Sequence, residues 1–422
     1  MADLRRTALI VGAGAGIAGD GLFLTALAWS VLQATGSPQQ LSLVLIVLTV
    51  VPLVTAPLAG QLVDRARAPD YLVGSEWLAA VVLAAAAGWL SMFTPGLPFF
   101  LLVAAVVPAF GSLSGPALPI MLARLSGPGR VTASMARAEV ANRVGRVVGP
   151  LLGGALIAVG DFRLCCLANA ASYVVSGIGW LVARGRLRAA GPEPGRHGRR
   201  GFTAGAQYVL THPDTRGLVA IALLANAAIS AVNVTLPLLA RGPLHAGSGA
   251  YGAMQAAFQV GMLLCAGALS VRPLPDRVLA NRRALGTSLA GLGVGFGLLA
   301  ASRTVPFALG AVLLAGGALS LTAMISDTRL VTEIPAAVQG RVMGLLIGTA
   351  GALRPAGTLA GGVVAGALGA AAATGIGAAA LAVLGGWYAL RRPAGSPPGG
   401  HAGNIMPAVS GSRRRQDNDH DV

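Results

Sequence analysis

The chain has 422 residues, of which 55% are hydrophobic and only 11% are charged. In a soluble globular domain about a quarter of the residues are charged, so this composition and a mean hydropathy of +0.71 exclude an ordinary soluble fold. A net charge of +16 in a soluble chain indicates a nucleic-acid partner, but here the 31 basic residues, all arginine, lie mostly between apolar stretches, so we expect no nucleic-acid binding.

Apolar stretches of about 20 residues recur along the chain, and each is long enough to cross a bilayer core about 30 Å thick as a helix. The helices expected to span the membrane cover, in chain order, residues 7–33, 41–63, 71–93, 97–123, 137–159, 162–183, 217–240, 248–271, 285–302, 305–326, 340–366 and 369–390. The sequence therefore predicts an all-α membrane protein with twelve transmembrane helices, embedded in the lipid bilayer of the cell inner membrane or plasma membrane.

A segment rich in Pro, Gly and Arg follows the sixth expected helix and divides the helices into two sets of six. The predicted organisation is an N-terminal six-helix bundle over residues 1–183, a cytoplasmic linker over 184–216, a C-terminal six-helix bundle over 217–391 and a disordered cytoplasmic tail over 392–422. Many secondary transporters consist of two such bundles, with the substrate path between them.

The positions of the arginines indicate how the chain is inserted. Once the expected helices are drawn, 25 of the 31 arginines lie on the side of both termini, three lie inside helices, and Arg163, Arg241 and Arg303 lie on the opposite side. Because cytoplasmic loops retain positive charge, both termini are predicted to be cytoplasmic.

A glycine-rich run in the first expected helix imitates a dinucleotide-binding turn. Gly14, Gly16 and Gly19 have the spacing G-x-G-x-x-G. Such a turn needs a strand before it and an acid about 20 residues later, and no acid lies between Asp20 and Asp64. Inside a helix the same glycines allow close packing against a neighbouring helix. We therefore expect no cofactor.

Asp20 lies near the middle of the first expected helix and hence near the membrane midplane. A carboxylate at this depth is costly, so Asp20 should be protonated much of the time or face a cation or water. An acid that exchanges protons here can couple a proton gradient to transport, and Asp20 is our leading candidate for that role. The alternative is a structural hydrogen bond between helices.

The fifth expected helix carries a polar stripe. Glu139 and Arg143 have the i, i+4 spacing of an ion pair, which leaves Arg146 without a local partner. Asp20 is a candidate counter-ion for Arg146, or for Arg354 in the eleventh expected helix, and we assign these five residues to proton coupling. The stripe must face protein or water, because facing lipid would cost several kcal/mol. Its spacing leaves open whether it binds a solute or seals the two halves together.

A weak internal repeat links the two halves. The fifth helix reads Arg137-x12-Pro150-x2-Gly153-Gly154, and the eleventh reads Arg341-x13-Pro355-x5-Gly361-Gly362. Each begins at an expected cytoplasmic arginine, meets a proline inside the membrane and continues into small residues. The repeat supports two halves of the same design.

Milder polar stripes occur in the second half. Asn226 and Asn233 share a face of the seventh expected helix, and Gln255 and Gln259 share a face of the eighth. Amides are tolerated in a membrane where they hydrogen-bond across helices or line a wet cavity, so we expect these four side chains to contact a substrate. The sequence contains no Ser-His-acid arrangement, metal-ligand cluster or phosphate loop, so we expect neither an enzyme nor a metal site.

Several motifs resemble those of the major facilitator superfamily. Gly60-Gln-Leu-Val-Asp64-Arg65 is similar to the superfamily's G-x-x-x-D-R signature between the second and third helices. The run Gly145-x3-Gly149-Pro150-x2-Gly153-Gly154 is similar to the fifth-helix signature of its drug/proton antiporters. Glu333-Ile-Pro335-x3-Gln339-Gly340-Arg341, together with Gly19-Asp20, resembles the branch that includes enterobactin and macrolide exporters.

The resemblance implies gating roles for the motif residues. Asp64 and Arg65 would form a cytoplasmic latch, since an acid at a helix end can accept hydrogen bonds from a neighbouring helix N-terminus. The Gly-Pro-x-x-Gly-Gly run would seal the cavity by close packing and a bend at Pro150. Gly340 and Arg341 would belong to the same gate in the second half.

Two departures from the family pattern affect the expected mechanism. After Arg65 the family's second glycine and basic pair are replaced by Arg67, Ala68 and Pro69, which predicts a weaker latch. The fourth helix lacks the arginine that many proton antiporters carry at mid-membrane, so Asp20 and the arginine stripe are our substitutes.

The expected protein is a monomeric exporter of a small hydrophobic or amphipathic molecule, driven by protons. Two alternatives remain open. One is an importer or facilitator of a nutrient with the same fold. The other is a membrane scaffold or sensor that transports nothing.

Overall fold

The computed structural model describes residues 2–63, 68–111, 113–126, 129–189, 207–279, 281–334 and 336–390. Within these ranges all regular secondary structure is helical, which confirms the all-α prediction for that part of the chain. Asp64, Arg65, most of the expected linker and the expected tail lie outside the described residues.

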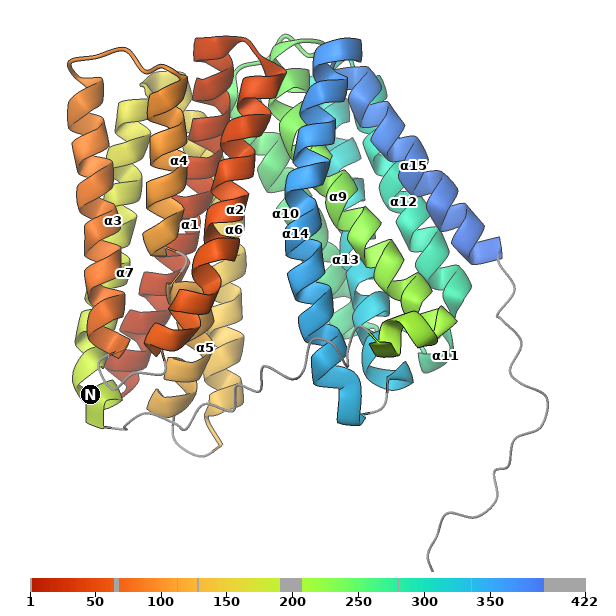
Figure 1. Ribbon diagram of the computed structural model, residues 1–422, viewed down its shortest axis with the longest axis horizontal. Helices are drawn as coiled ribbons and strands as arrows, with labels where there is room; N and C mark the ends of the chain where they lie inside the picture. Colours follow the sequence, from red (N-terminus) through yellow and green to blue (C-terminus); the bar gives the residue numbers. More distant parts are fainter. Residues whose placement is uncertain are drawn as a thin grey trace, which may run out of the picture. The chain divides into compact units, whose positions relative to one another are not determined.

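The first half of the chain contributes seven of the helices that the structure describes. They are α1 (Ala2–Thr35), α2 (Pro38–Val63), α3 (Ala68–Leu90), α4 (Leu97–Gly111), α5 (Ser114–Leu125), α6 (Val131–Val159) and α7 (Phe162–Ala189). Successive helices run in opposite directions, except that α5 continues in the direction of α4 (Figure 1). We call the end of the bundle where α1 begins the lower end, and the end where α1 finishes the upper end.

The second half repeats this up-and-down arrangement. It consists of α9 (Pro213–Arg241), α10 (Ser248–Val271), the single turn α11 (Asp276–Leu279), α12 (Arg282–Ala301), α13 (Val305–Glu333), α14 (Ala336–Leu368) and α15 (Ala370–Leu390). In the described ranges, nine helices are long and apolar enough to cross a membrane: α1, α2, α3, α7, α9, α10, α12, α13 and α15. These spans make the chain a multi-pass membrane protein.

The expected helix over residues 97–123 is two helices in the structure. It is broken between Gly111 and Ser114, where α4 ends and α5 begins. Pro108 lies inside α4 and Pro119 inside α5, and each removes a backbone donor from the helical ladder. A continuous apolar stretch does not reveal where such a break falls.

The sixth expected helix is longer than predicted. α7 continues to Ala189, so residues 184–189 of the expected linker are helical. Leu187 is buried and therefore still faces the bundle, while Arg184 lies 4.0 Å from Asp70 at the start of α3.

Helix α1 is the centre of the first half, and glycines place it there. A β-carbon at Gly14 would meet Ala141 of α6, and one at Gly12 would meet the backbone of Ser176 in α7. The glycine-rich run is thus a helix-packing face, as the sequence predicts. Gly145 and Gly153 of α6 lie in turn against the backbone of α1.

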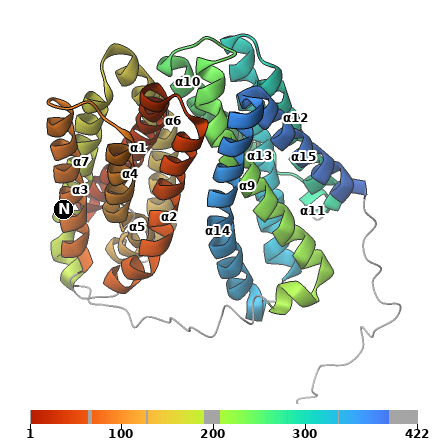
Figure 2. The same cartoon turned by 45° about the horizontal axis from the view of Figure 1, so that its top comes forward.

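The two halves meet along two helix pairs, α6 with α10 and α2 with α14 (Figure 2). Gly154 of α6 packs on Gly252 of α10, and the Ser248 hydroxyl donates to the carbonyl oxygen of Gly154 at 3.0 Å. Gly362 of α14 lies against Ser42 of α2. These contacts lie towards the upper end of each helix.

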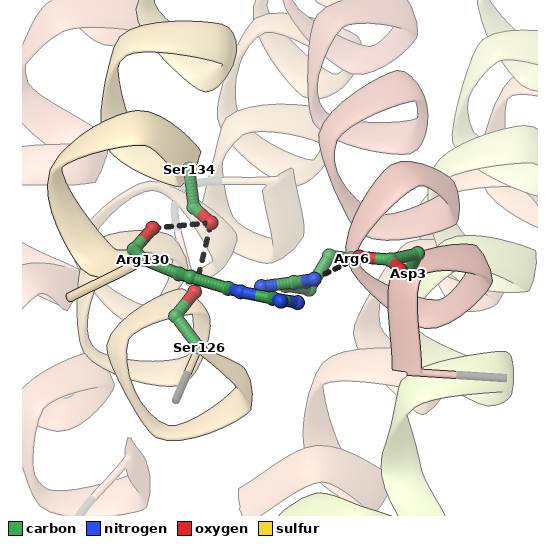
Figure 3. A network of polar contacts seen from close by, with 5 residues as sticks. All are labelled: Asp3, Arg6, Ser126, Arg130 and Ser134. Carbon is green, nitrogen blue, oxygen red and sulfur yellow. Dashed lines mark hydrogen bonds and ion pairs between the residues drawn. The ribbon is translucent and has the colours of Figure 1, made fainter. Parts of the chain in front are cut away.

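Most described arginines lie at the lower end, where α1, α6, α9 and α12 begin and α5, α7 and α13 finish. One cluster is shown in Figure 3: Arg6 forms an ion pair with Asp3, and the side chain of Arg130 reaches towards Arg6. Ser134 of α6 donates to the backbone oxygen of Arg130 and accepts from Ser126 at 2.9 Å. These two hydrogen bonds join the end of α5 and the residue before α6 to the first turn of α6.

Candidate functional site

A cavity of about 760 Å³ lies between the two halves. Helices α1, α2 and α6 line it from the first half, and α9, α10, α12, α13 and α14 line it from the second. Its polar lining consists of Thr49, Glu139, Arg143, Arg146, Asn226, Ser230, Asn233, Tyr251, Gln255, Gln259, Arg354 and Thr358. A volume of this size fits a drug-sized molecule.

The charged stripe of α6 faces this cavity. Glu139, Arg143 and Arg146 all belong to its lining, and the Arg143 Nε atom lies 2.9 Å from Glu139 Oε1. The glycines of α6 lie on a neighbouring face of that helix, and Gly149 there packs against α1. The residues that the sequence placed on one helical face therefore divide between the cavity and the helix packing.

The amide stripes of α9 and α10 reach the same cavity. Asn226, Asn233, Gln255 and Gln259 are all lining residues. The Asn226 side chain accepts a hydrogen bond from the Arg354 guanidinium at 3.4 Å and donates to the carbonyl oxygen of Ala222 at 2.9 Å. Asn226 thus orients an arginine of α14 from the neighbouring α9.

Contacts above the cavity close it towards the upper end. Trp29 of α1 stacks on Tyr251 of α10 with ring centroids 6.0 Å apart. The Arg241 guanidinium at the end of α9 donates to the carbonyl oxygen of Leu32 at 2.6 Å. Both contacts join one half to the other.

Asp20 contacts a tyrosine of a neighbouring helix, as in the structural alternative, and not the arginines that were its candidate partners. Its Oδ1 atom accepts a hydrogen bond from the Tyr173 hydroxyl of α7 at 2.8 Å. Among the described residues it forms no ion pair with Arg146 or Arg354, and it is not part of the cavity lining. The Asp20 side chain keeps an accessible surface, while Gly19 and Gly21 beside it pack against α7 and α6.

A second carboxyl group, which our sequence analysis missed, lies near Asp20. Glu76 of α3 is only 2% exposed, and its Oε1 atom accepts a hydrogen bond from Ser114 at the start of α5. Its Oε2 atom has no hydrogen-bond partner, although Ser176 and Trp180 of α7 lie nearby. The signal was present in the sequence, since Glu76 is an acid inside an expected membrane helix.

Both carboxyl groups lie beside the break between α4 and α5. Ser114 is the first residue of α5, and the Tyr173 hydroxyl lies against Gly111, the last residue of α4. A broken helix in a membrane leaves backbone groups that need polar partners. Asp20, Tyr173 and Glu76 therefore form a polar cluster among α1, α7 and α3.

Some of the expected latch and gate residues lie outside the described part of the chain. Gly60 belongs to α2, and Gly340 and Arg341 belong to α14, but their surroundings are not described. Asp64 and Arg65 lie outside the described residues. Of the motif residues whose contacts are described, Gly145, Gly149 and Gly153 face α1, and Gly154 faces the other half.

The model of the Major Facilitator Superfamily matches residues 9–354 of the chain. The chain belongs to this superfamily. The match begins within α1 and ends at Arg354 in α14, so it includes every helix that lines the cavity. The chain is therefore a membrane transport protein by family, as its composition and helices indicated.

Solved structures of major facilitator transporters share the fold at low sequence identity. A peptide transporter POT in complex with sulfate is 12% identical, with a TM-score of 0.70 over 91% of this chain and 93% of the other. A bacterial homologue of the iron transporter ferroportin in an inward-facing state is 14% identical, with a TM-score of 0.67 over 92% and 99%. A bacterial metal transporter is 16% identical, with a TM-score of 0.66 over the same shares. No curated protein matches the chain.

Proposed function

We propose that this major facilitator protein is a secondary active transporter with twelve transmembrane helices. It exports a small hydrophobic or amphipathic molecule, such as a drug, siderophore or secondary metabolite, by proton antiport. The nine apolar spans, the broken pair α4/α5 and the polar helices α6 and α14 together supply the twelve crossings. A resemblance to enterobactin and macrolide exporters supports the export direction.

The observation that carries this proposal is a cavity built by both halves and closed at one end. Helices from each half supply its polar lining, while Trp29, Tyr251 and Arg241 close it at the upper end. Alternating access needs such a pocket, because rocking of the two halves exposes it to each side in turn.

The arginines support an orientation in which the lower end faces the cytoplasm. Arg6, Arg130, Arg184 and Arg283 lie at helix ends there, whereas Arg241 is one of few described arginines at the upper end. With this orientation both termini are cytoplasmic, in the inner or plasma membrane. The structure then corresponds to an inward-facing state that is ready to accept a cytoplasmic substrate.

Asp20 is our proposed proton carrier, although in this state it contacts Tyr173 and none of the described cavity arginines. Its side chain is accessible, so a proton can reach it. The Tyr173 hydroxyl donates to the charged carboxylate and can accept a hydrogen bond from the protonated carboxyl group. A midplane acid that alternates between charged and neutral forms can couple proton entry to the return of the empty carrier.

The proposal is tested in vesicles that contain the purified protein and an imposed proton gradient. Compounds from an antibiotic and siderophore panel that protect growth of expressing cells are added, and proton release is followed with a pH-sensitive dye. Compound movement against the gradient, with protons moving the other way, is expected. Asp20→Asn should abolish it and leave folding intact.

Asp161→Asn is the matched control, since Asp161 caps α7 at the upper end and an asparagine oxygen can still accept from the Leu164 amide. Full activity of Asp20→Asn would remove Asp20 from the mechanism. Compound and protons moving in the same direction would indicate an importer. Loss of function on deletion of residues 393–422, with no flux in vesicles, would indicate a scaffold or sensor.

A further inference from the structure

From the charges of the central cavity we infer that its substrate is an anion, whose acidic group is held between Arg146 of α6 and Arg354 of α14. This inference rests on the proposed transport function and specifies the class of molecule transported. It concerns a carboxylate, sulfonate or similar group on an amphipathic body.

The first argument is the balance of charge. Among the described residues that line the cavity, three are arginines and one is an acid. That acid, Glu139, already pairs with Arg143 at 2.9 Å. Arg146 and Arg354 form no ion pair with any described carboxylate, so the lining has two positive charges in excess.

The second argument is the cost of this excess. An arginine stays charged at any pH that a cell tolerates, and its charge is strongly disfavoured at membrane depth unless it meets an anion or water. Arg146 and Arg354 are both exposed and both line the cavity. Neither forms an ion pair with a described acid. A bound anion would neutralise them, and a bound cation would add to the repulsion.

The third argument is geometry. Arg146 lies in α6 of the first half, four residues before Pro150, and Arg354 lies in α14 of the second half, directly before Pro355; both line the cavity. Each guanidinium presents a planar fork of donors that suits an acidic group with two or more oxygens. An anion bound by both would join the two halves.

Arg354 is also hydrogen-bonded within the protein. Asn226 accepts from the Arg354 guanidinium at 3.4 Å and is held in turn by the backbone of Ala222. The remaining lining supplies the rest of a recognition site. Gln255 and Gln259 offer amides, and Phe258 and Ile229 offer apolar surface for the body of the substrate.

The test measures binding to the purified protein in lipid nanodiscs, where no gradient is needed. Thermal stabilisation is recorded with 1-naphthaleneacetate, the neutral 1-naphthaleneacetamide and a naphthylmethyl-trimethylammonium cation, which share one apolar body. We expect the acid to stabilise the protein and to bind at least about tenfold more tightly than the amide, the size of effect that a charge-assisted hydrogen bond supplies. The cation should bind more weakly than either.

Arg146→Gln and Arg354→Gln should each remove the preference for the acid and change amide binding by less than about twofold, because glutamine keeps donors but no charge. The matched controls are Arg163→Gln and Arg303→Gln at the upper end, which should keep the preference. Equal stabilisation by acid and amide, no stabilisation by any probe, or a preference for the cation overturns the inference.

The result is separable from the test of transport. A preference for the acid without proton-driven flux would reject the proposed antiport and leave the anion site intact. Proton-driven export that is restricted to neutral and cationic compounds would confirm transport and reject the anion site.

Discussion

Glu76 is held at one oxygen only, which has a consequence for stability. Ser114 donates to Oε1, while Oε2 is buried without a hydrogen-bond partner. A buried polar atom without a partner costs about 1–3 kcal/mol, and more if the group is charged. Proteins retain such a cost where a function requires the group, and Glu76 lies beside Asp20 at the break between α4 and α5.

Glu76→Gln is therefore expected to raise thermal stability at neutral pH. The amide oxygen keeps the hydrogen bond from Ser114, and the amide nitrogen takes the place of the unpartnered Oε2 atom. A neutral group without a partner costs less to bury than a charged one, so the variant should gain stability. The measurement is the Tm of purified protein in one detergent. Glu139→Gln is the control, because Glu139 is exposed to the cavity and paired with Arg143, so its Tm should not rise. A lower Tm for Glu76→Gln than for Glu139→Gln would contradict this account.

At the scale of helices, paired glycines explain how the internal repeat works. Gly153 packs on α1 of its own half and Gly154 on α10 of the other half. In α14, Gly361 packs on Ala231 of its own half and Gly362 on Ser42 of the other. One glycine of each pair thus builds the bundle, and the next closes the two bundles at the upper end.

Gly154→Val is expected to shift the protein away from the state described here. A β-carbon at Gly154 would lie 3.0 Å from the Cα atom of Gly252, so the upper contact cannot close without moving a helix backbone. Labelling of a cysteine placed at Tyr251 with a membrane-impermeant reagent, applied from outside, should increase. Gly88→Val is the control, since no atom lies within 4 Å of a β-carbon there. Equal labelling in both variants would show that Gly154 does not close the gate.

The sequence predicted the helices better than their interruptions. Hydropathy identifies an apolar stretch, so the α4/α5 region was recognised as a crossing, but a break depends on which neighbour supplies partners for freed backbone groups. Asn226 and Gln255 could be assigned to a cavity from their spacing, since a membrane leaves polar side chains few other places. For Arg146 the spacing required only that it face protein or water. The partner of Asp20 could not be predicted, because Tyr173 is 153 residues away in the chain and reaches it only through packing.

At the scale of the molecule, alternating access requires that the upper contacts be strong enough to close and weak enough to open. The Arg241 and Ser248 hydrogen bonds and the stack of Trp29 on Tyr251 are each worth about 1 kcal/mol. Their sum is a few kcal/mol, which is in the range that ligands overcome by differential binding. No single contact should therefore be essential to folding, and each should change the balance between states.

Arg241→Gln tests this balance. Loss of a hydrogen bond worth about 1 kcal/mol should move the equilibrium about fivefold towards an outward-open state. Pulsed electron spin resonance can measure this equilibrium with spin labels at Ala34→Cys and Gly247→Cys across the upper end, in a protein whose three native cysteines are replaced by alanine.

Longer distances between the labels at the upper end should become more populated, and a label pair at Ala133→Cys and Val271→Cys across the lower end should move closer. Arg303→Gln, which removes the same charge from the loop between α12 and α13, should leave both distances unchanged. A change at the upper pair with none at the lower pair would mean local fraying of α9, and would contradict a rocking motion in which the two ends open in turn.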